Sequence, residues 1–229
     1  MATKKDDNNI LSIEIKAVEQ RAMQVQIEGE SPLLMHKWSE KAKKEILDKQ
    51  MGKKTAKKEL KNPVRDYAES MYYVGNVPKI LKDVPEDIDY ETAQAAIEEA
   101  SYGFPASAFK ECALSAAFQQ GVIPKKTSAR GAFRIIGDEC GGEMVTIHGD
   151  PEMREDMVKI GGMSKVADIR YRGAICNWTA TLNITYLPNN ITPEQIVAFL
   201  NLGGMCNGVG EWRNEKGGTF GAFHVKATS

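Results

Sequence analysis

The stretch AICNWTATLNITYL, residues 174–187, alternates apolar and polar side chains along its whole length. Apolar residues stand at every second position from Cys176 through Trp178 to Tyr186, with asparagine or threonine between them. A period of two predicts a β-strand that has one face on a core and the other in solvent. Parallel strands covered on both faces read as continuous apolar runs, so the pattern favours an antiparallel sheet over a doubly wound α/β fold.

The flanking segments predict two helices and several more strands. Downstream, Thr-Pro-Glu-Gln at 192–195 has the pattern of a capped helix start, and Gly203 is expected to end that helix. Upstream, small residues indicate a helix over 106–119. Further strands are expected at 13–27, 132–136, 143–148 and 219–227. This order approximates the split βαβ arrangement, so we predict an α+β, ferredoxin-like (RRM-like) core with an antiparallel sheet.

Residues 29–104 interrupt this order, and we interpret them as a helical, Lys-rich insertion in the core. A basic helical stretch is predicted over 38–60, and a second helix near 64–73. Residues 1–9 are polar and are expected to be disordered. The remaining residues, 10–229, are predicted to form a single domain.

Charge is unevenly distributed although the formal net charge is only −1. Lysines crowd the segment 37–65, whereas 83–99 carries acidic residues and no basic ones. We expect the basic face to contact phosphate and the acidic face to contact solvent or a second copy of the chain in a homo-oligomer. Two solvated helix faces would give the same pattern.

The segment Gly203–Gly221, GGMCNGVGEWRNEKGGTFG, contains seven glycines directly after a predicted helix. Such a loop can approach another surface closely, and its amides can form an anion-binding nest. Trp212, Arg213 and Lys216 place stacking area beside positive charge. The segment matches neither a Walker A loop nor a dinucleotide fingerprint, and an ordinary glycine-rich turn is the alternative.

Two runs together resemble the RAMP superfamily, the ferredoxin-like subunits that form the RNA-coating backbone of CRISPR effector complexes. They are FPASAFK at 104–110, and GVGEWR at 208–213 with GGTFG at 217–221. The resemblance implies a RAMP-like domain in which Ser107, Lys110 and the glycine-rich loop approach the bound strand, and in which 29–104 is a fingers-like insertion. The layout is also similar to that of small bacteriophage proteins, which implies a stand-alone member of the superfamily that acts on DNA or RNA.

We therefore predict a non-catalytic protein that binds single-stranded nucleic acid and oligomerises along it. The residues expected to contact the strand are Lys53, Lys54, Lys57, Lys58, Ser107, Lys110, Lys125, Lys126, Arg130, Arg170, Arg172, Gly208, Gly210, Trp212, Arg213, Lys216 and Gly217. Two alternatives stay open. One is a metal-independent endoribonuclease that uses His36 or His148, and the other is a structural protein that binds another protein.

Cysteines and histidines are too scattered to predict a zinc site, so we expect no metal and no cofactor. The start, MATKKDDNNI, lacks an apolar signal region, and no long uncharged apolar run follows. We therefore expect a cytoplasmic protein, in the host cytoplasm if a phage encodes it, without contact to membranes.

Overall fold

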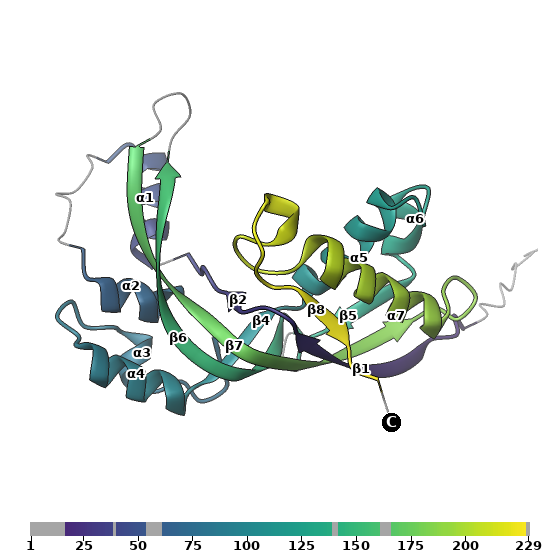
Figure 1. The fold of residues 1–229 in the computed structure, drawn as a ribbon, viewed down its shortest axis with the longest axis horizontal. Coiled ribbons are helices and arrows are strands. Elements are labelled where there is room, and N and C mark those ends of the chain that lie inside the picture. Colours follow the sequence, from purple (N-terminus) through teal and green to yellow (C-terminus); the bar gives the residue numbers. More distant parts are fainter. Residues whose placement is uncertain (1–16, 39, 54–60, 139–141, 161–165, 228–229) are drawn as a thin grey trace, which may run out of the picture.

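The computed structural model describes residues 17–38, 40–53, 61–138, 142–160 and 166–227 (Figure 1). Within these residues the chain forms an eight-stranded sheet made of β1 (Arg21–Gly29), β2 (Leu33–Leu34), β3 (Tyr73–Val74), β4 (Ser101–Pro105), β5 (Phe133–Ile136), β6 (Met144–Ile160), β7 (Val166–Tyr186) and β8 (Phe223–Val225). The α-helices are α1 (Glu40–Gln50), α2 (Pro63–Ser70), α3 (Lys79–Lys82), α4 (Tyr90–Glu99), α5 (Ala106–Gln119), α6 (Lys126–Arg130) and α7 (Pro193–Leu202). A π-helical turn η1 (Gly203–Asn207) and a 3₁₀ turn η2 (Asn214–Lys216) follow α7.

The strand order confirms the ferredoxin-like core. The main path of the sheet is β3-β4-β6-β7-β1-β8, and every pairing along it is antiparallel. Because β1 and β6 both pair with β7, they run parallel, and α5 lies between them in the chain. Likewise, β7 and β8 flank β1, with α7 between them in the chain. Two split βαβ units therefore interlock, as the fold requires.

Strand β7 organises the sheet through both of its edges. One edge pairs with β1, from Arg21 opposite Tyr186 to Glu28 opposite Thr179, and then with β2. The other edge pairs with β6 from Val166 to Ala180 and with β5 from Asn183 to Tyr186. The sequence indicated β5 and β6 as two short strands joined by a turn. They lie instead one after the other along β7, and β6 has 17 residues.

The expected alternation in β7 is confirmed over its second half. Trp178, Leu182 and Ile184 are buried, and the intervening Thr179 and Thr181 are half-buried on the opposite face of the strand. Helices α5 and α7 cover one face of this part of the sheet (Figure 1). The alternation fails at Cys176, which is half-buried. Asn177 has φ 48°, and the register between β6 and β7 shifts between His148 and Asp150, so a bulge resets the side-chain pattern there.

The segment between β1 and α5 extends the sheet and packs around the outer halves of β6 and β7. It contributes β2, β3 and β4 to the sheet and α1 to α4 to the surroundings of β6 and β7 (Figure 1). Helix α2 is fixed to β7 because the Gly173 amide donates to Ser70 Oγ at 2.8 Å. The acidic segment 83–99 contains α4, and the side chain of Asp89 caps the start of that helix. The interpretation as a fingers-like insertion stays a prediction.

The start of α7 is as the sequence predicted, but the predicted end at Gly203 is wrong. Thr192 and Gln195 form the expected capping box at its start. Gly203 does not end the helical path, because its φ is −57° and the chain continues through η1. The termination falls at Gly208, with φ 70°. No α-helix among the described residues is long and apolar enough to cross a bilayer.

We expect Trp178→Ala to lower the free energy of unfolding by about 3–5 kcal/mol, because it removes a fully buried aromatic side chain. Trp178 is 0% exposed, donates from Nε1 to the Ser31 carbonyl at 2.8 Å, and packs its ring against Phe109 and Phe223. Urea denaturation measures the change. Trp38→Ala is the control, since Trp38 is 60% exposed and should change stability by less than about 0.5 kcal/mol. Equal losses in both variants would contradict this account of the core.

Candidate nucleic-acid interface

The glycine-rich loop, residues 208–221, is closed by its own backbone hydrogen bonds. The amides of Val209 and Gly221 donate to the carbonyls of Gly221 and Pro32, each at 2.9 Å. Further internal donors are the amides of Gly208, Glu211, Lys216, Gly217, Gly218 and Phe220. The anion-binding nest expected from the sequence is therefore not formed by these amides, because each one already has an internal acceptor.

Gly210 is required by the contact of the loop with β2 rather than by a bound nucleic-acid strand. Its φ is +83°, and a Cβ there would lie 2.5 Å from the Leu34 carbonyl oxygen of β2. The next amide, Glu211 N, donates to that same carbonyl at 3.0 Å. This close approach of the loop backbone to β2 fixes the backbone position of Glu211 and of the residues that follow it.

Trp212 projects from this fixed loop. It is 43% exposed, and its φ of 49° is a left-handed conformation that bulky residues rarely adopt. Trp212 is not part of the buried hydrophobic core of the described residues. An exposed indole held in a strained backbone is the kind of feature that is found at functional sites.

Arg213 lies beside Trp212, but its charge is already paired within the loop. Nε and Nη2 donate to Glu215 Oε2 at 2.9 and 2.7 Å, and Nη1 donates to the Gly210 carbonyl at 3.1 Å. Lys216 is exposed in η2, and Gly217 is exposed with φ 77°. The loop thus presents one exposed aromatic ring, one paired arginine and one exposed lysine.

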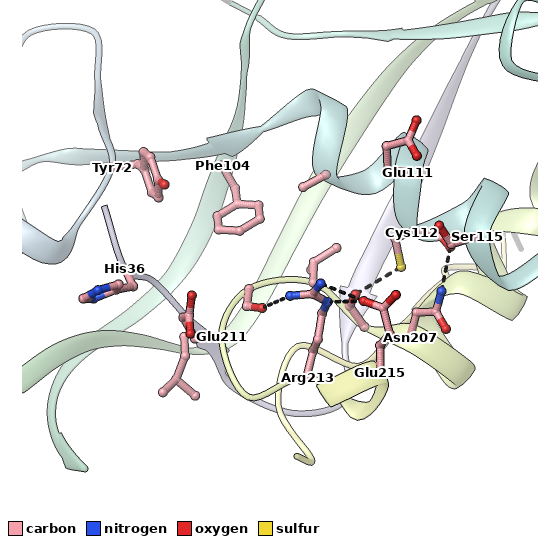
Figure 2. A pocket seen from close by; sticks show the side chains of 15 residues that line it. His36, Tyr72, Phe104, Glu111, Cys112, Ser115, Asn207, Glu211, Arg213 and Glu215 are labelled. Carbon is pink, nitrogen blue, oxygen red and sulfur yellow. Dashed lines mark hydrogen bonds and ion pairs between the residues drawn. The ribbon is translucent and has the colours of Figure 1, made fainter. Parts of the chain in front are cut away.

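The loop forms one wall of a pocket of about 320 Å³, which we call the loop pocket (Figure 2). Strand β2, strand β4 and helix α5 supply the other walls. Its lining includes Leu34, His36, Tyr72, Phe104, Cys112, Asn207, Glu211 and Arg213. Burial raises the pKa of the Cys112 thiol to about 12, and Cys112 Sγ contacts the Gly208 carbonyl oxygen at 3.2 Å. That cysteine is therefore a packing residue.

A second pocket of about 580 Å³, the hairpin pocket, lies between the base of β7 and helices α1 and α2. His36 and Glu211 line both pockets, so the two hollows adjoin at these side chains. Arg170 and Tyr171 line the hairpin pocket on the β7 side. Together the pockets make a continuous hollow from the glycine-rich loop to β7.

Arg172 lies beneath this junction and does not reach the surface, contrary to the expectation from the sequence. It is 1% exposed because Ser70 of α2 and Glu211 of the loop approach β7 here and cover it. Arg172 Nη1 lies 4.0 Å from Asp156 Oδ2 and 3.9 Å from Glu211 Oε2. Within the described part of the chain, Arg172 Nε, Arg172 Nη1, Asp156 Oδ2 and His36 Nδ1 are buried without a hydrogen-bond partner.

Burial controls the protonation of the two titratable rings that line the loop pocket. It lowers the pKa of His36, and Arg172 lowers it further, so the imidazole is neutral at pH 7. It raises the pKa of Tyr72, and Glu211 raises it further, so the phenol keeps its proton. Neither group adds charge to the pocket at neutral pH.

A second group of the expected residues gathers on α5 and α6. Lys110 Nζ donates to the Arg130 carbonyl at 2.7 Å, and Lys126 Nζ donates to Ser115 Oγ at 2.6 Å. Ser107 is exposed on α5, and Lys125 is exposed directly before α6. Lys53 lies apart at the end of α1, and Lys54, Lys57 and Lys58 lie outside the described residues.

Of the nine expected cations that the structure describes, five form an ion pair with an acidic residue of the same chain. The pairs are Lys53 with Asp48, Arg130 with Glu111, Arg170 with Asp168, Arg172 with Asp156 and Glu211, and Arg213 with Glu215. A ligand phosphate would therefore have to replace carboxylates as the partner of these groups.

Sequence reasoning missed most of the loop pocket. Tyr72, Phe104 and Glu211 come from three segments that are distant in the chain, and no spacing rule connects them. Glu211 lies inside the GVGEWR run, but only the glycines and its neighbours were singled out. The sequence signal that would have identified Glu211 was its position directly after Gly210.

No protein-family model and no curated protein matches the sequence. Among solved structures, the chain is similar to one in the cryo-EM structure of the Type III-B Cmr-beta bound to cognate target RNA, at 11% identity and a TM-score of 0.49. That match covers 91% of this chain and 59% of the other. A second similarity, to Cmr6 from Pyrococcus furiosus, has 11% identity and a TM-score of 0.34, and covers 92% of this chain and 100% of the other. The fold assignment rests on the strand order of the chain itself.

We expect Asp156→Leu to lower the free energy of unfolding by about 3–5 kcal/mol, because it leaves the buried Arg172 with a weaker counter-charge. The double variant Asp156→Leu with Arg172→Met should recover most of that loss, since no buried charge is then stranded. Thermal and urea denaturation of the two single variants and the double variant measure the coupling. Additive losses would show that the two side chains do not form one network.

Proposed function

We propose that this protein is a non-catalytic protein that binds single-stranded nucleic acid, either DNA or RNA, and assembles along the strand as a homo-oligomer. The observation that carries the proposal is the glycine-rich loop. Its hydrogen-bonded backbone holds the exposed Trp212 beside Arg213 and Lys216. Proteins that bind single strands combine aromatic stacking surfaces with basic groups along the backbone of the nucleic acid.

The α5–α6 group offers a second basic surface for the strand. Burial lowers the pKa of Lys110, Glu111 raises it, and Arg130 and Arg134 lower it further. Helix α5 lines the loop pocket and also holds Lys110, so one strand could contact both regions. The resemblance of 104–110 and 208–221 to the RAMP superfamily supports the same two contact regions.

Assembly along the strand is proposed from the separation of charge. Helix α4 carries exposed Glu91, Glu98 and Glu99, whereas α6 carries Lys126 and Arg130. A contact between the acidic surface of one copy and the basic surface of the next would be head-to-tail, and such contacts extend into filaments unless their rotation closes a ring. The similarity of the layout to bacteriophage proteins supports a role in the host cytoplasm during phage replication or counter-defence.

One observation favours the endoribonuclease as a second candidate. The loop pocket brings neutral His36 and protonated Tyr72 to the same hollow, where a base and an acid would be needed. The same assay that tests binding decides between the candidates, because cleavage shortens the strand.

The test is a gel shift with labelled single-stranded DNA and RNA at two salt concentrations, combined with light scattering. The proposal expects a shift that weakens as salt rises, an intact strand, and particles larger than one chain. Shortened RNA would instead support the endoribonuclease. Absence of any shift at low salt would favour a protein-binding role.

Trp212→Gly should weaken single-strand binding by about 1–3 kcal/mol, because one stacking surface is lost. It should leave the melting temperature unchanged or slightly higher, since glycine adopts φ 49° without strain. Phe118→Ala is the matched control, because Phe118 is 45% exposed and Trp212 is 43% exposed. Wild-type affinity in Trp212→Gly, with the control also unchanged, would exclude the loop from the interface.

Glu215→Gln should strengthen binding, because it releases Arg213 from its carboxylate partner. One further phosphate contact should steepen the plot of log affinity against log salt by about 0.7 for a single strand. Glu194→Gln, an exposed residue at the start of α7 and outside both proposed surfaces, controls for the change in net charge. If both variants gain affinity equally, net charge rather than Arg213 explains the effect.

A further inference from the structure

The loop pocket has the shape and the lining of a site for one planar ring system. Tyr72 and Phe104 form its aromatic wall, with ring centroids 5.8 Å apart and planes at 81°. Leu34 and Val209 add apolar surface. At about 320 Å³ the pocket lies at the lower end of the range of roughly 300–1,000 Å³ for small-molecule sites, so it suits one base rather than several nucleotides.

Glu211 gives this pocket a carboxylate that can still accept hydrogen bonds. Its carboxylate accepts no hydrogen bond from any residue that the structure describes, and its nearest cation, Arg172 Nη1, is 3.9 Å away. Its backbone amide is fixed to the Leu34 carbonyl at 3.0 Å, so the start of the side chain is held in place. Figure 2 shows Glu211, His36 and Tyr72 together at one end of the pocket.

An ionised carboxylate only accepts hydrogen bonds, through two adjacent oxygens. Guanine is the base whose pairing edge carries two adjacent donors, N1–H and N2–H₂. Adenine and cytosine place a ring acceptor beside their single amino group, and uracil and thymine place their one N–H between two carbonyls. The Tyr72 hydroxyl, which keeps its proton, can donate to a neighbouring carbonyl oxygen such as O6 of guanine.

The order of residues in the loop fits a strand that passes outside the pocket. Glu211 and Arg213 both line the pocket, whereas Trp212 between them is exposed. A strand stacked on Trp212 could therefore turn one base inward past Glu211, because the three side chains begin at consecutive positions of a rigid loop. Unstacking one base of a single strand costs little compared with opening a duplex.

We propose that the loop pocket receives a single guanine base, and that the Glu211 carboxylate recognises it through two hydrogen bonds beside the aromatic wall of Tyr72 and Phe104. This inference rests on the proposed function, since the base is taken to come from a bound single strand. It adds a base preference to a protein whose other contacts are with phosphates and with base faces that carry no sequence information.

The experiment compares oligothymidylates of about 20 nucleotides that carry one central guanosine, adenosine or cytidine, or none. One bidentate contact should raise the affinity of the guanosine probe about tenfold over the other three. Glu211→Gln should abolish this difference, because an amide presents a donor in place of one acceptor. Glu69→Gln, a half-buried carboxylate in the adjoining hairpin pocket, should preserve it.

Competition with guanosine monophosphate distinguishes a pocket that takes a base from the bound strand from one that takes a free nucleotide. With the strand as the source of the base, an excess of the nucleotide should reduce binding of the guanosine probe to the level of plain oligothymidylate and no further. Equal affinity of the wild type for all four probes overturns the pocket assignment while strand binding stands.

If no probe binds, the proposed function fails, and the melting temperature with guanosine monophosphate alone tests the pocket. A rise in the wild type and in Glu69→Gln that is lost in Glu211→Gln supports recognition of guanine. No rise in any of them overturns it. Circular dichroism and melting of each variant without nucleotide verify that it is folded.

Discussion

The antiparallel pairing of β7 with its neighbours is the constraint on which the structure depends. One edge of this 21-residue strand holds β1 and β2, and the other holds β5 and β6. A slip of one residue between β7 and β1 would put the apolar side chains of the two strands on opposite faces of the sheet. The β2 pairing also sets the Leu34 carbonyl, to which Glu211 of the glycine-rich loop is bonded. The sheet register therefore determines where the candidate site lies.

Much of the core could be predicted because local signals agree with the tertiary structure. The alternation at 178–186, the capping box at Thr192 and the small-residue helix at 106–119 are all present as expected. The lengths of β6 and β7 could not be predicted. The outer half of β6 carries charged residues on both of its faces, so no period of two marks it. Gly203 was misjudged because it lies against Ala113 of α5, a tertiary contact that a turn rule does not contain.

The site was predictable only as a collection of residue types. Glycines, Trp212 and Arg213 identified the loop, but the pocket beneath it also needs Tyr72 and Phe104, which reach it through the pairings of β3 and β4. Arg172 illustrates the opposite error. An arginine in an extended, polar segment is ordinarily exposed, yet Asp156 on the paired strand and Glu211 on the loop make its burial tolerable. Ion pairs between distant segments leave no trace in the spacing of residues.

The paired cations bear on how a chain of net charge −1 would bind a polyanion, as we propose. Arg170, Arg172 and Arg213 each already have a carboxylate of the same chain nearby. A phosphate that displaces such a carboxylate exchanges one ion pair for another, so each contact contributes less than a free cation would. Affinity would then depend more on stacking and on the number of copies along the strand than on charge alone. On this view a rigid loop with a strained, exposed indole matters more than the total number of lysines, because it offers a stacking surface beside a basic group.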